Sequence, residues 1–358
     1  MCFATSGRGS GDEARITSLL SDFDVYVYPF DRTRKARNVL RIVLLMRKRR
    51  PALVVMEGTG VAGGISVLVG QRLFGVPYLV SSGDAVGPFV GGIRRAAAFP
   101  AWIYEFVLYR RSAGFIGWTP YLVGRALTMG APRAVTAANF VAYPEIRQTR
   151  RVVRERLGIP EKMIVFGIVG SLVWNRRCGY CYGMELVEAI RQVQRRDVAV
   201  LIVGEGTGRE RLADRAGSEL GQRIFLPGAV PRDLVTSYLA AMDVGSLPQS
   251  VDQVGSFRYT TKLSEDQSVR LPIVTGQIPM AYDLVSEWSW RLPGRSPWSG
   301  TYVDALAALM RSIDHDEIAA IKARVPESID AFDQAAQRRR VGMFVSDTLN
   351  AADEDSRS

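Results

Sequence analysis

Lys262 and Glu265 stand three positions apart in a segment, residues 262–269, whose pattern predicts a short helix. Residues at this spacing share one face of a helix, and both lie near its N-terminal end. A helix N-terminus attracts phosphate, a lysine there adds positive charge, and a glutamate can accept hydrogen bonds from two ribose hydroxyls. The pair therefore suits a nucleotide, although the same spacing also describes an ordinary solvated ion pair.

The elements around this pair alternate between strand and helix. Strands are predicted at residues 164–169, 198–203, 223–226, 243–247 and 271–275, and helices at 184–194 and 231–241. Small and polar residues follow the strands: Gly170 and Ser171, a basic loop with Arg176 and Arg177, Gly204 and Glu205, and the run Gly228, Ala229, Val230. This order predicts a parallel α/β domain with its ligand-binding turns after the strands.

The first part of the chain alternates in the same way. Strands are predicted at residues 2–5, 24–28, 52–56, 77–81 and 113–119, and helices at 34–49, 99–111 and 120–129. Residues 143–160, with Pro144, Pro160 and several arginines, read as a linker. We therefore expect an N-terminal domain over residues 1–150, a C-terminal domain over 151–330, and a final segment, 331–358. In that segment a helix to about residue 349 packs back on the first domain and a short tail frays.

From about residue 162 onward the order of these motifs resembles the retaining glycosyltransferases of family four. Residues 260–276, which carry Lys262 and Glu265, are similar to the donor-site signature of that family. The resemblance implies the GT-B fold, an α/β architecture of two facing Rossmann-like domains with a cleft between them. It also implies transfer of a sugar from a nucleoside diphosphate with retention of configuration.

The resemblance implies a role for each matching residue. Glu265 would bind the ribose, Arg177 with its neighbour Arg176 would contact the diphosphate, and Lys262 would reach the same phosphates. Gly228, Ala229 and Val230 match the backbone that faces the base. Gly204 and Glu205 close the strand beneath, and Ser171 stands where an arginine is often found. The nucleotide sugar is a co-substrate, so neither a bound cofactor nor a metal is expected.

Two positions depart from the family pattern. Phe257 occupies the place of a glutamate that contacts the transferred sugar, and Gly83 occupies the place of a histidine in the first domain. Asp84 adjoins that gap, so we predict that it makes a polar contact with donor or acceptor. These departures leave open a non-catalytic relative with a vestigial donor site.

Other motifs support other chemistry. The turn from Gly58 to Gly63 fits the G-x-G-x-x-G dinucleotide fingerprint, and Asp84 lies where a ribose-binding acid would be expected, which favours an oxidoreductase as the alternative. Cys178 and Cys181 form a C-x-x-C pair, which suits redox chemistry or half of a zinc site. Asp22 and Asp24, and likewise Asp314 and Asp316, have the D-x-D spacing of metal-dependent glycosyltransferases of another fold.

Composition and charge bear on the partners. The chain has 358 residues, and its fractions of apolar residues (47%) and charged residues (23%) are those of a folded globular protein. Its net charge is +10. Residues 1–150 hold 20 Lys and Arg against 9 Asp and Glu, so the excess of positive charge lies in the first half. Basic residues there flank apolar and aromatic ones, as in a helix at an anionic membrane surface, although core packing with a solvated basic face gives the same pattern. No nucleic-acid module is visible.

The same composition bears on location. No segment reaches the roughly 20 apolar residues of a spanning helix. Three cysteines do not make a disulfide framework. We therefore expect a cytoplasmic enzyme, peripheral at the inner face of the membrane, with a lipid-linked or polysaccharide-assembly acceptor.

Overall fold

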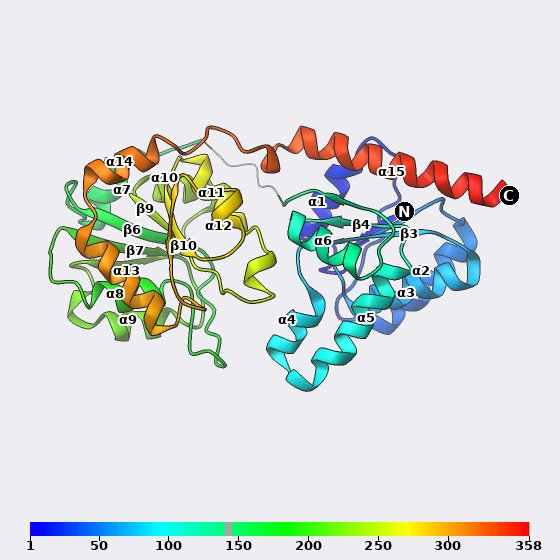
Figure 1. Cartoon of the computed structure of the whole chain (residues 1–358), viewed down its shortest axis with the longest axis horizontal. Helices are drawn as coiled ribbons and strands as arrows, with labels where there is room; N and C mark the ends of the chain where they lie inside the picture. The colour runs from blue at the N-terminus through cyan, green and yellow to red at the C-terminus, as the bar shows by residue number, and fades with distance from the viewer. Residues whose placement is uncertain (140–144, 358) are drawn as a thin grey trace. The chain divides into compact units, whose positions relative to one another are not determined.

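A computed structural model describes residues 1–139 and 145–357 of the chain. Its contacts divide the chain into two compact units (Figure 1). Unit 1 comprises Met1–Phe140, Phe257–Tyr259 and Asp330–Ser358, and unit 2 comprises Val141–Ser256 and Thr260–Ile329.

Unit 1 is built on a parallel sheet of five strands in the order β1-β2-β3-β4-β5. Successive side chains of a strand point to opposite faces, and both faces of this sheet are covered. In β2, for example, Val54 and Met56 enter one core cluster while Val55 enters the other. The strands are β1 (Cys2–Ala4), β2 (Val54–Glu57), β3 (Tyr78–Ser82), β4 (Gly114–Gly117) and β5 (Ala134–Thr136).

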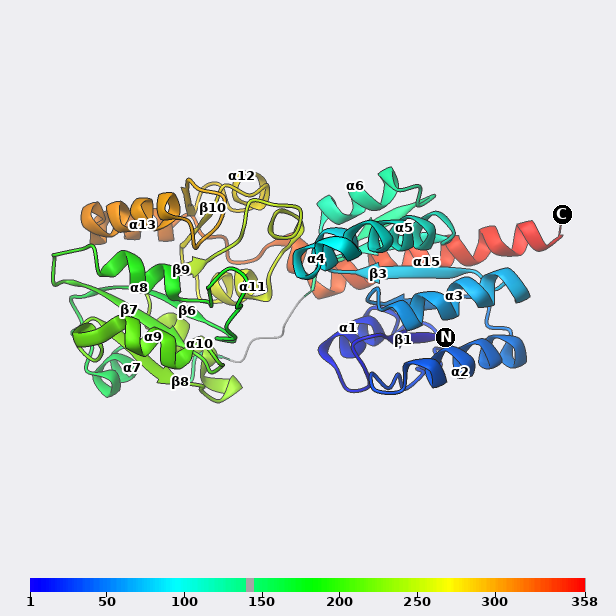
Figure 2. The ribbon, with the colours of Figure 1, turned by 90° about the horizontal axis from the view of Figure 1, so that it is seen from below.

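Helices cover both faces of this sheet. On one face α2 and α3 pack side by side, with α5 and α6 beside them, and α1 and α15 cover the other (Figure 1 and Figure 2). A short helix, α4, precedes α5 and forms a helical hairpin with it through the 3₁₀ turn Arg95–Ala97. The helices are α1 (Gly11–Leu19), α2 (Lys35–Arg49), α3 (Val61–Phe74), α4 (Val86–Ile93), α5 (Ala98–Arg110), α6 (Pro120–Thr128) and α15 (Gln334–Arg357).

Unit 2 is built on a parallel sheet of six strands in the order β11-β10-β9-β6-β7-β8. Ile164, Phe166 and Ile168 of β6 enter the cluster beneath α8, α9 and α13, whereas Val165 enters the cluster beneath α7 and α10. The strands are β6 (Ile164–Val169), β7 (Val198–Val203), β8 (Ile224–Gly228), β9 (Val244–Leu247), β10 (Ile273–Gly276) and β11 (Ser289–Leu292).

The helices of unit 2 alternate with its strands, as the sequence predicts. They are α7 (Arg150–Leu157), α8 (Met184–Ile190), α9 (Arg209–Ala216), α10 (Val235–Ala240), α11 (Thr261–Ser268), α12 (Met280–Asp283), α13 (Gly300–Ser312) and α14 (His315–Lys322). Within residues 1–139 and 145–357, none of the helices combines the length and the apolar character that crossing a membrane requires.

Several elements differ from expectation. The strand expected at 24–28 is reduced to one bridge, between Val27 and Cys2. The expected linker, 143–160, begins outside the described residues and contains α7, which buries Val153 in a core cluster. The expected frayed tail continues α15 as far as Arg357. The structure of each of these segments depends on tertiary packing or on the continuation of a neighbouring helix. Neither can be predicted from the local amino-acid composition.

Candidate functional site

At the carboxyl edge of the sheet in unit 2, glycines after β6 and β7 form hydrogen bonds to the ends of the neighbouring strands. The Gly170 N–H donates to the Val203 carbonyl, and the Gly204 N–H donates to the Gly228 carbonyl, each at 2.9 Å. Gly204 has a φ of +147°, and a methyl group on it would overlap the carbonyl oxygen of Gly170. Only glycine therefore allows the β6 and β7 turns to approach this closely.

Lys262 lies over the turn that follows β6. The chain leaves β6 for β7 on one side, and β9 lies on the other, so β6 and β9 flank the switch point where ligands bind in open α/β sheets. α11 follows β9, and its Lys262 ammonium lies so near Gly170 that a methyl group there would be 2.7 Å from the Nζ. The Tyr182 ring supports the ammonium at 4.4 Å from its centroid.

Glu265 lies one helical turn beyond Lys262 and is partly buried. Burial raises the pKa of its carboxyl, and the positive charges of Lys262 and Arg232 act in the opposite direction. Arg232 begins the 3₁₀ turn that follows β8. The two cations that lower the pKa of Glu265 therefore come from two different elements. Glu265 is thus a partly buried carboxylate on the same helix as Lys262, and the charges of Lys262 and Arg232 act on its pKa.

The turn that carries Arg176 and Arg177 is rigidly supported. Asn175 and Tyr180 pair across it, and the Arg177 N–H donates to the Asn175 Oδ1 at 3.0 Å. The buried Glu185 accepts from the Tyr180 hydroxyl at 2.8 Å and from the Ser246 hydroxyl of β9 at 2.9 Å. Both arginines are exposed on this turn.

The two cysteines of this turn have structural surroundings. Cys181 is buried, and burial raises the pKa of its thiol to about 11. Burial also raises the pKa of Cys178. A reactive cysteine needs a lowered pKa, so these thiols do not have the surroundings of a redox pair.

In unit 1, Gly83 is packed against an aromatic ring. A methyl group on Gly83 would overlap the indole of Trp118, which follows β4. The Trp118 Nε1 donates to the buried Glu57 at 3.1 Å, and the same carboxylate accepts from Arg15 at 2.7 Å. The Trp118 indole therefore lies directly against Gly83.

Asp84 and Phe257 also have partners that the sequence does not indicate. The Arg258 Nε donates to the Asp84 Oδ1 at 2.6 Å. The Phe257 side chain packs against the apolar core of unit 1, and its carbonyl accepts from the Thr119 hydroxyl at 2.7 Å. Phe257 is thus a packing residue of unit 1, and Asp84 is in an ion pair with Arg258.

The glycines of the dinucleotide-like turn have a packing role. Methyl groups on Gly58, Gly60 or Gly63 would each crowd the side chain of Thr5, which follows β1. These glycines let the turn between β2 and α3 approach the end of β1. That contact accounts for the G-x-G-x-x-G spacing without a nucleotide.

The paired aspartates also serve the fold. Asp22 pairs with Arg338 of α15, with an Oδ2 to Nε distance of 3.0 Å. Asp314 caps α14, where its Oδ1 accepts from the Glu317 N–H at 2.8 Å. Among residues 1–139 and 145–357, no three His, Cys, Asp or Glu side chains come together as metal ligands would.

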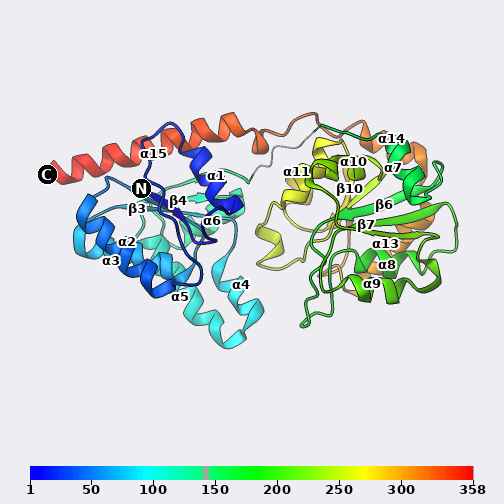
Figure 3. The same ribbon diagram turned by 180° about the vertical axis from the view of Figure 1, so that it is seen from behind.

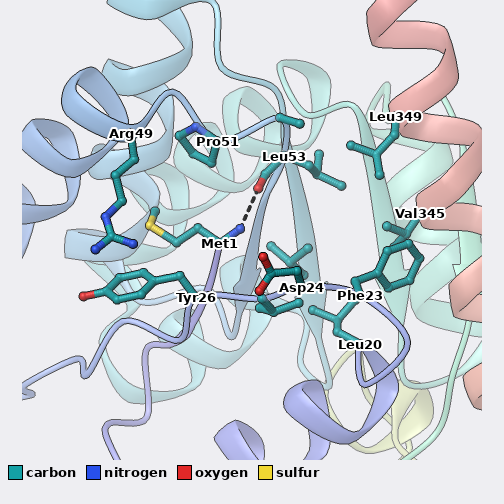
Figure 4. Close-up of a pocket in the computed structure, with 13 residues that line it drawn as sticks. Met1, Leu20, Phe23, Asp24, Tyr26, Arg49, Pro51, Leu53, Val345 and Leu349 are labelled. Carbon is teal, nitrogen blue, oxygen red and sulfur yellow. Dashed lines mark hydrogen bonds between the residues drawn. The ribbon is translucent and has the colours of Figure 1, made fainter.

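A separate cavity of about 520 Å³ lies at the amino ends of β1 and β2 (Figure 4). The Met1 amino group donates to the Leu53 carbonyl at 2.9 Å beside it, and burial lowers the pKa of that amine. Ligands of parallel sheets bind at the carboxyl ends of the strands. This cavity lies at the opposite edge of the unit 1 sheet from the glycine turn that follows β2.

Sequence reasoning missed three contributors: Arg232, Tyr182 and Trp118. Arg232 follows the turn from Gly228 to Pro231, so its position directly after a strand was the available signal. Tyr182 and Trp118 act through contacts with Lys262 and Gly83, which are remote in sequence. No spacing pattern reports contacts of that kind.

Comparison with known proteins supports the interpretation of unit 2. Residues 164–311 match the family model described as glycosyl transferases group 1. This match spans β6 to α13, including every predicted donor-site residue of the second half. No curated protein matches the chain in sequence.

Solved structures match nearly the whole chain. Anabaena Alr3699/HepE in complex with UDP-glucose has a TM-score of 0.69 at 16% identity, covering 97% of this chain and 99% of its own. The Thermosynechococcus elongatus sucrose-phosphate synthase has a TM-score of 0.59 at 15% identity, covering 91% and 81%. S. aureus MnaA with UDP has a TM-score of 0.60 at 12% identity, covering 98% and 96%. These likenesses confirm the predicted GT-B fold, with its two Rossmann-like domains.

Proposed function

We propose that this chain, whose residues 164–311 match the family model described as glycosyl transferases group 1, transfers a sugar from a nucleoside diphosphate with retention of configuration. The observation that supports the proposal is that Lys262 of α11 lies beside Gly170 at the switch point of the second sheet, with Glu265 three residues farther along the same helix. The relatives with bound UDP or UDP-glucose support UDP as the nucleotide to test first.

Each site residue has a role in the proposed chemistry. Glu265 accepts hydrogen bonds from the ribose, and the cations Lys262 and Arg177 neutralise the diphosphate as it leaves. Gly228, Ala229 and Val230 face the base. No enzymic nucleophile is needed, because the acceptor hydroxyl attacks the face from which the nucleoside diphosphate departs and gives its proton to an oxygen of that leaving phosphate. Rate acceleration comes from positioning and charge stabilisation. We propose that the donor is held without a metal or resident cofactor.

The proposed acceptor is a lipid-linked or polysaccharide-assembly intermediate at the cytoplasmic face of the membrane. This proposal is supported by the charge of residues 1–150, which include 20 basic residues and only 9 acidic ones. An anionic acceptor phosphate and an anionic bilayer surface would both be attracted to such a domain.

Turnover tests this function. The protein is incubated with a panel of UDP-sugars and GDP-sugars and a bacterial lipid extract, and release of the nucleoside diphosphate is followed. We expect release from one class of donor, with the anomeric configuration retained in the product. Inversion would contradict the retaining mechanism, and nucleotide binding without turnover of any donor would support the non-catalytic alternative.

The pKa of Glu265 predicts how nucleotide affinity depends on pH. Burial raises the pKa of its carboxyl above the ordinary value of 4.5. Only the ionised form can accept hydrogen bonds from both ribose hydroxyls. UDP affinity should therefore be lost, as the pH falls, at a midpoint above 4.5. In Lys262→Met the midpoint should move to higher pH, because Lys262 lowers this pKa.

Calorimetry across pH measures this dependence. Glu265→Gln is the control, since it retains the titration of the nucleotide's own phosphate. A wild-type profile that coincides with that of Glu265→Gln would show that Glu265 does not set the dependence.

A further inference from the structure

The helical hairpin of α4 and α5 carries several large apolar side chains that the described residues of unit 1 leave exposed. Its most exposed member, Phe99, keeps 68% of its surface accessible, and Trp102 keeps 44%. Phe99, Trp102 and Phe106 stack in a row along α5, with centroids 6.3 and 5.6 Å apart. Large exposed residues of the hairpin are Phe89, Phe99, Trp102, Ile103 and Val107.

The opposite side of α5 is buried in the unit. Leu108 and Tyr109 belong to the core, and the Tyr104 hydroxyl donates to the Thr59 carbonyl at 3.1 Å. α5 is thus apolar on both its buried and its exposed faces. A helix apolar all round is normally covered on every side, so a second apolar environment is expected on the exposed face.

The base of the hairpin is fixed while its turn projects from the unit (Figure 1 and Figure 3). Glu105 is fully buried, accepts from the Val86 and Gly87 N–H groups at the start of α4, and pairs with Arg125 of α6 at 2.7 Å. This network anchors both helices. The exposed aromatic row is therefore presented on a supported scaffold.

The exposed charges of the hairpin have one sign. Glu105 is the only acidic residue between positions 86 and 111, and it is buried and paired. The exposed charged side chains there are Arg94 and Arg95 at the turn and Arg110 and Arg111 at the end of α5. Basic side chains around exposed aromatic and aliphatic ones suit a surface with anionic headgroups over hydrocarbon.

We propose that the α4–α5 hairpin inserts its turn and aromatic row into an anionic lipid bilayer, and that this hairpin is how unit 1 meets the membrane. The proposal rests on the proposed function, because it accounts for access to a lipid-carried acceptor. A two-fold contact with a second copy through the same surface would bring the arginines of both copies together. That repulsion favours the bilayer over a dimer.

Vesicle partitioning tests the proposal. The full chain should bind phosphatidylglycerol vesicles and bind phosphatidylcholine vesicles much more weakly. Phe99→Asp should weaken partitioning onto phosphatidylglycerol by roughly tenfold or more, because an apolar anchor is lost and a negative charge gained. Replacing both Arg94 and Arg95 with glutamine should weaken it by about thirtyfold, because two cations near the bilayer surface are lost.

Matched variants make the result specific. Met343 of α15 is 64% exposed on the other face of the sheet, so Met343→Asp should bind as the wild type does. Leu40 is 61% exposed on the basic helix α2, and Leu40→Asp reports on that rival surface. Brominated lipid should quench a component of the tryptophan emission that is absent in Trp102→Phe.

Three results would overturn the proposal: unchanged binding in Phe99→Asp, loss of binding in Leu40→Asp alone, or self-association that Phe99→Asp abolishes without any vesicle binding. UDP affinity should be the same in all these variants. Failure of vesicle binding with UDP binding intact contradicts the hairpin assignment alone. Failure of UDP binding with vesicle binding intact contradicts the donor site alone.

Discussion

Glu265→Ala is expected to weaken UDP binding by roughly 10- to 100-fold, the loss that follows removal of a hydrogen-bonding charged group. The carboxylate is partly buried, and the positive charges of Lys262 and Arg232 lower its pKa, so its removal also takes away a negative charge that offsets theirs. Those cations would still attract the diphosphate. Residual binding should therefore depend more steeply on salt than wild-type binding does.

Titration calorimetry of the two proteins at several salt concentrations checks this expectation. Glu287→Ala is the matched control, because Glu287 is an exposed acid of unit 2 outside the site. It should bind UDP as the wild type does. Equal affinity in Glu265→Ala and Glu287→Ala would remove Glu265 from the site.

Gly204→Ala is expected to disrupt the donor site and to destabilise unit 2 by about 3 kcal/mol or more. Gly204 has a φ of +147°, which an L-residue rarely adopts, and the added methyl would overlap the carbonyl oxygen of Gly170. Relief requires separating the β6 turn from the β7 turn. That movement displaces Gly170 from beneath Lys262, so UDP affinity should fall together with stability.

Gly221→Ala separates clash from backbone strain. Gly221 also has a positive φ, of +77°, but a methyl group there would meet no atom within 4 Å. It should cost less stability than Gly204→Ala and leave UDP affinity unchanged. Thermal melts with calorimetry compare the two, and an equal loss of stability would mean that strain, and not the β6–β7 contact, is responsible.

The fold was largely predictable because buried parallel strands are continuous apolar runs and the turns that follow them are rich in glycine. β6, β7 and β9 lie where the pattern places them, within one residue at each end. α4 was missed because Val86–Ile93 contains glycine and proline, which lower helix propensity. Its N-terminus is stabilised instead by Glu105, a residue of the next helix.

The site was predictable only in part. The spacing of Lys262 and Glu265 indicated one helical face, and the structure places the first beside Gly170 and the second among cations. Which strand ends meet depends on sheet order, so Arg232 could not be assigned to Glu265 from sequence. The partners of Asp84 and Gly83, Arg258 and Trp118, are equally remote along the chain.

The most direct measurement is a calorimetric titration of the wild-type protein with UDP, GDP and NAD in turn. A donor site built on α11 and the glycine turns of the second sheet predicts saturable binding of UDP or GDP. It also predicts no binding of NAD, because Thr5 already accounts for the glycines of the β2–α3 turn. Binding of NAD without binding of UDP or GDP would contradict the proposed donor site and support the oxidoreductase alternative.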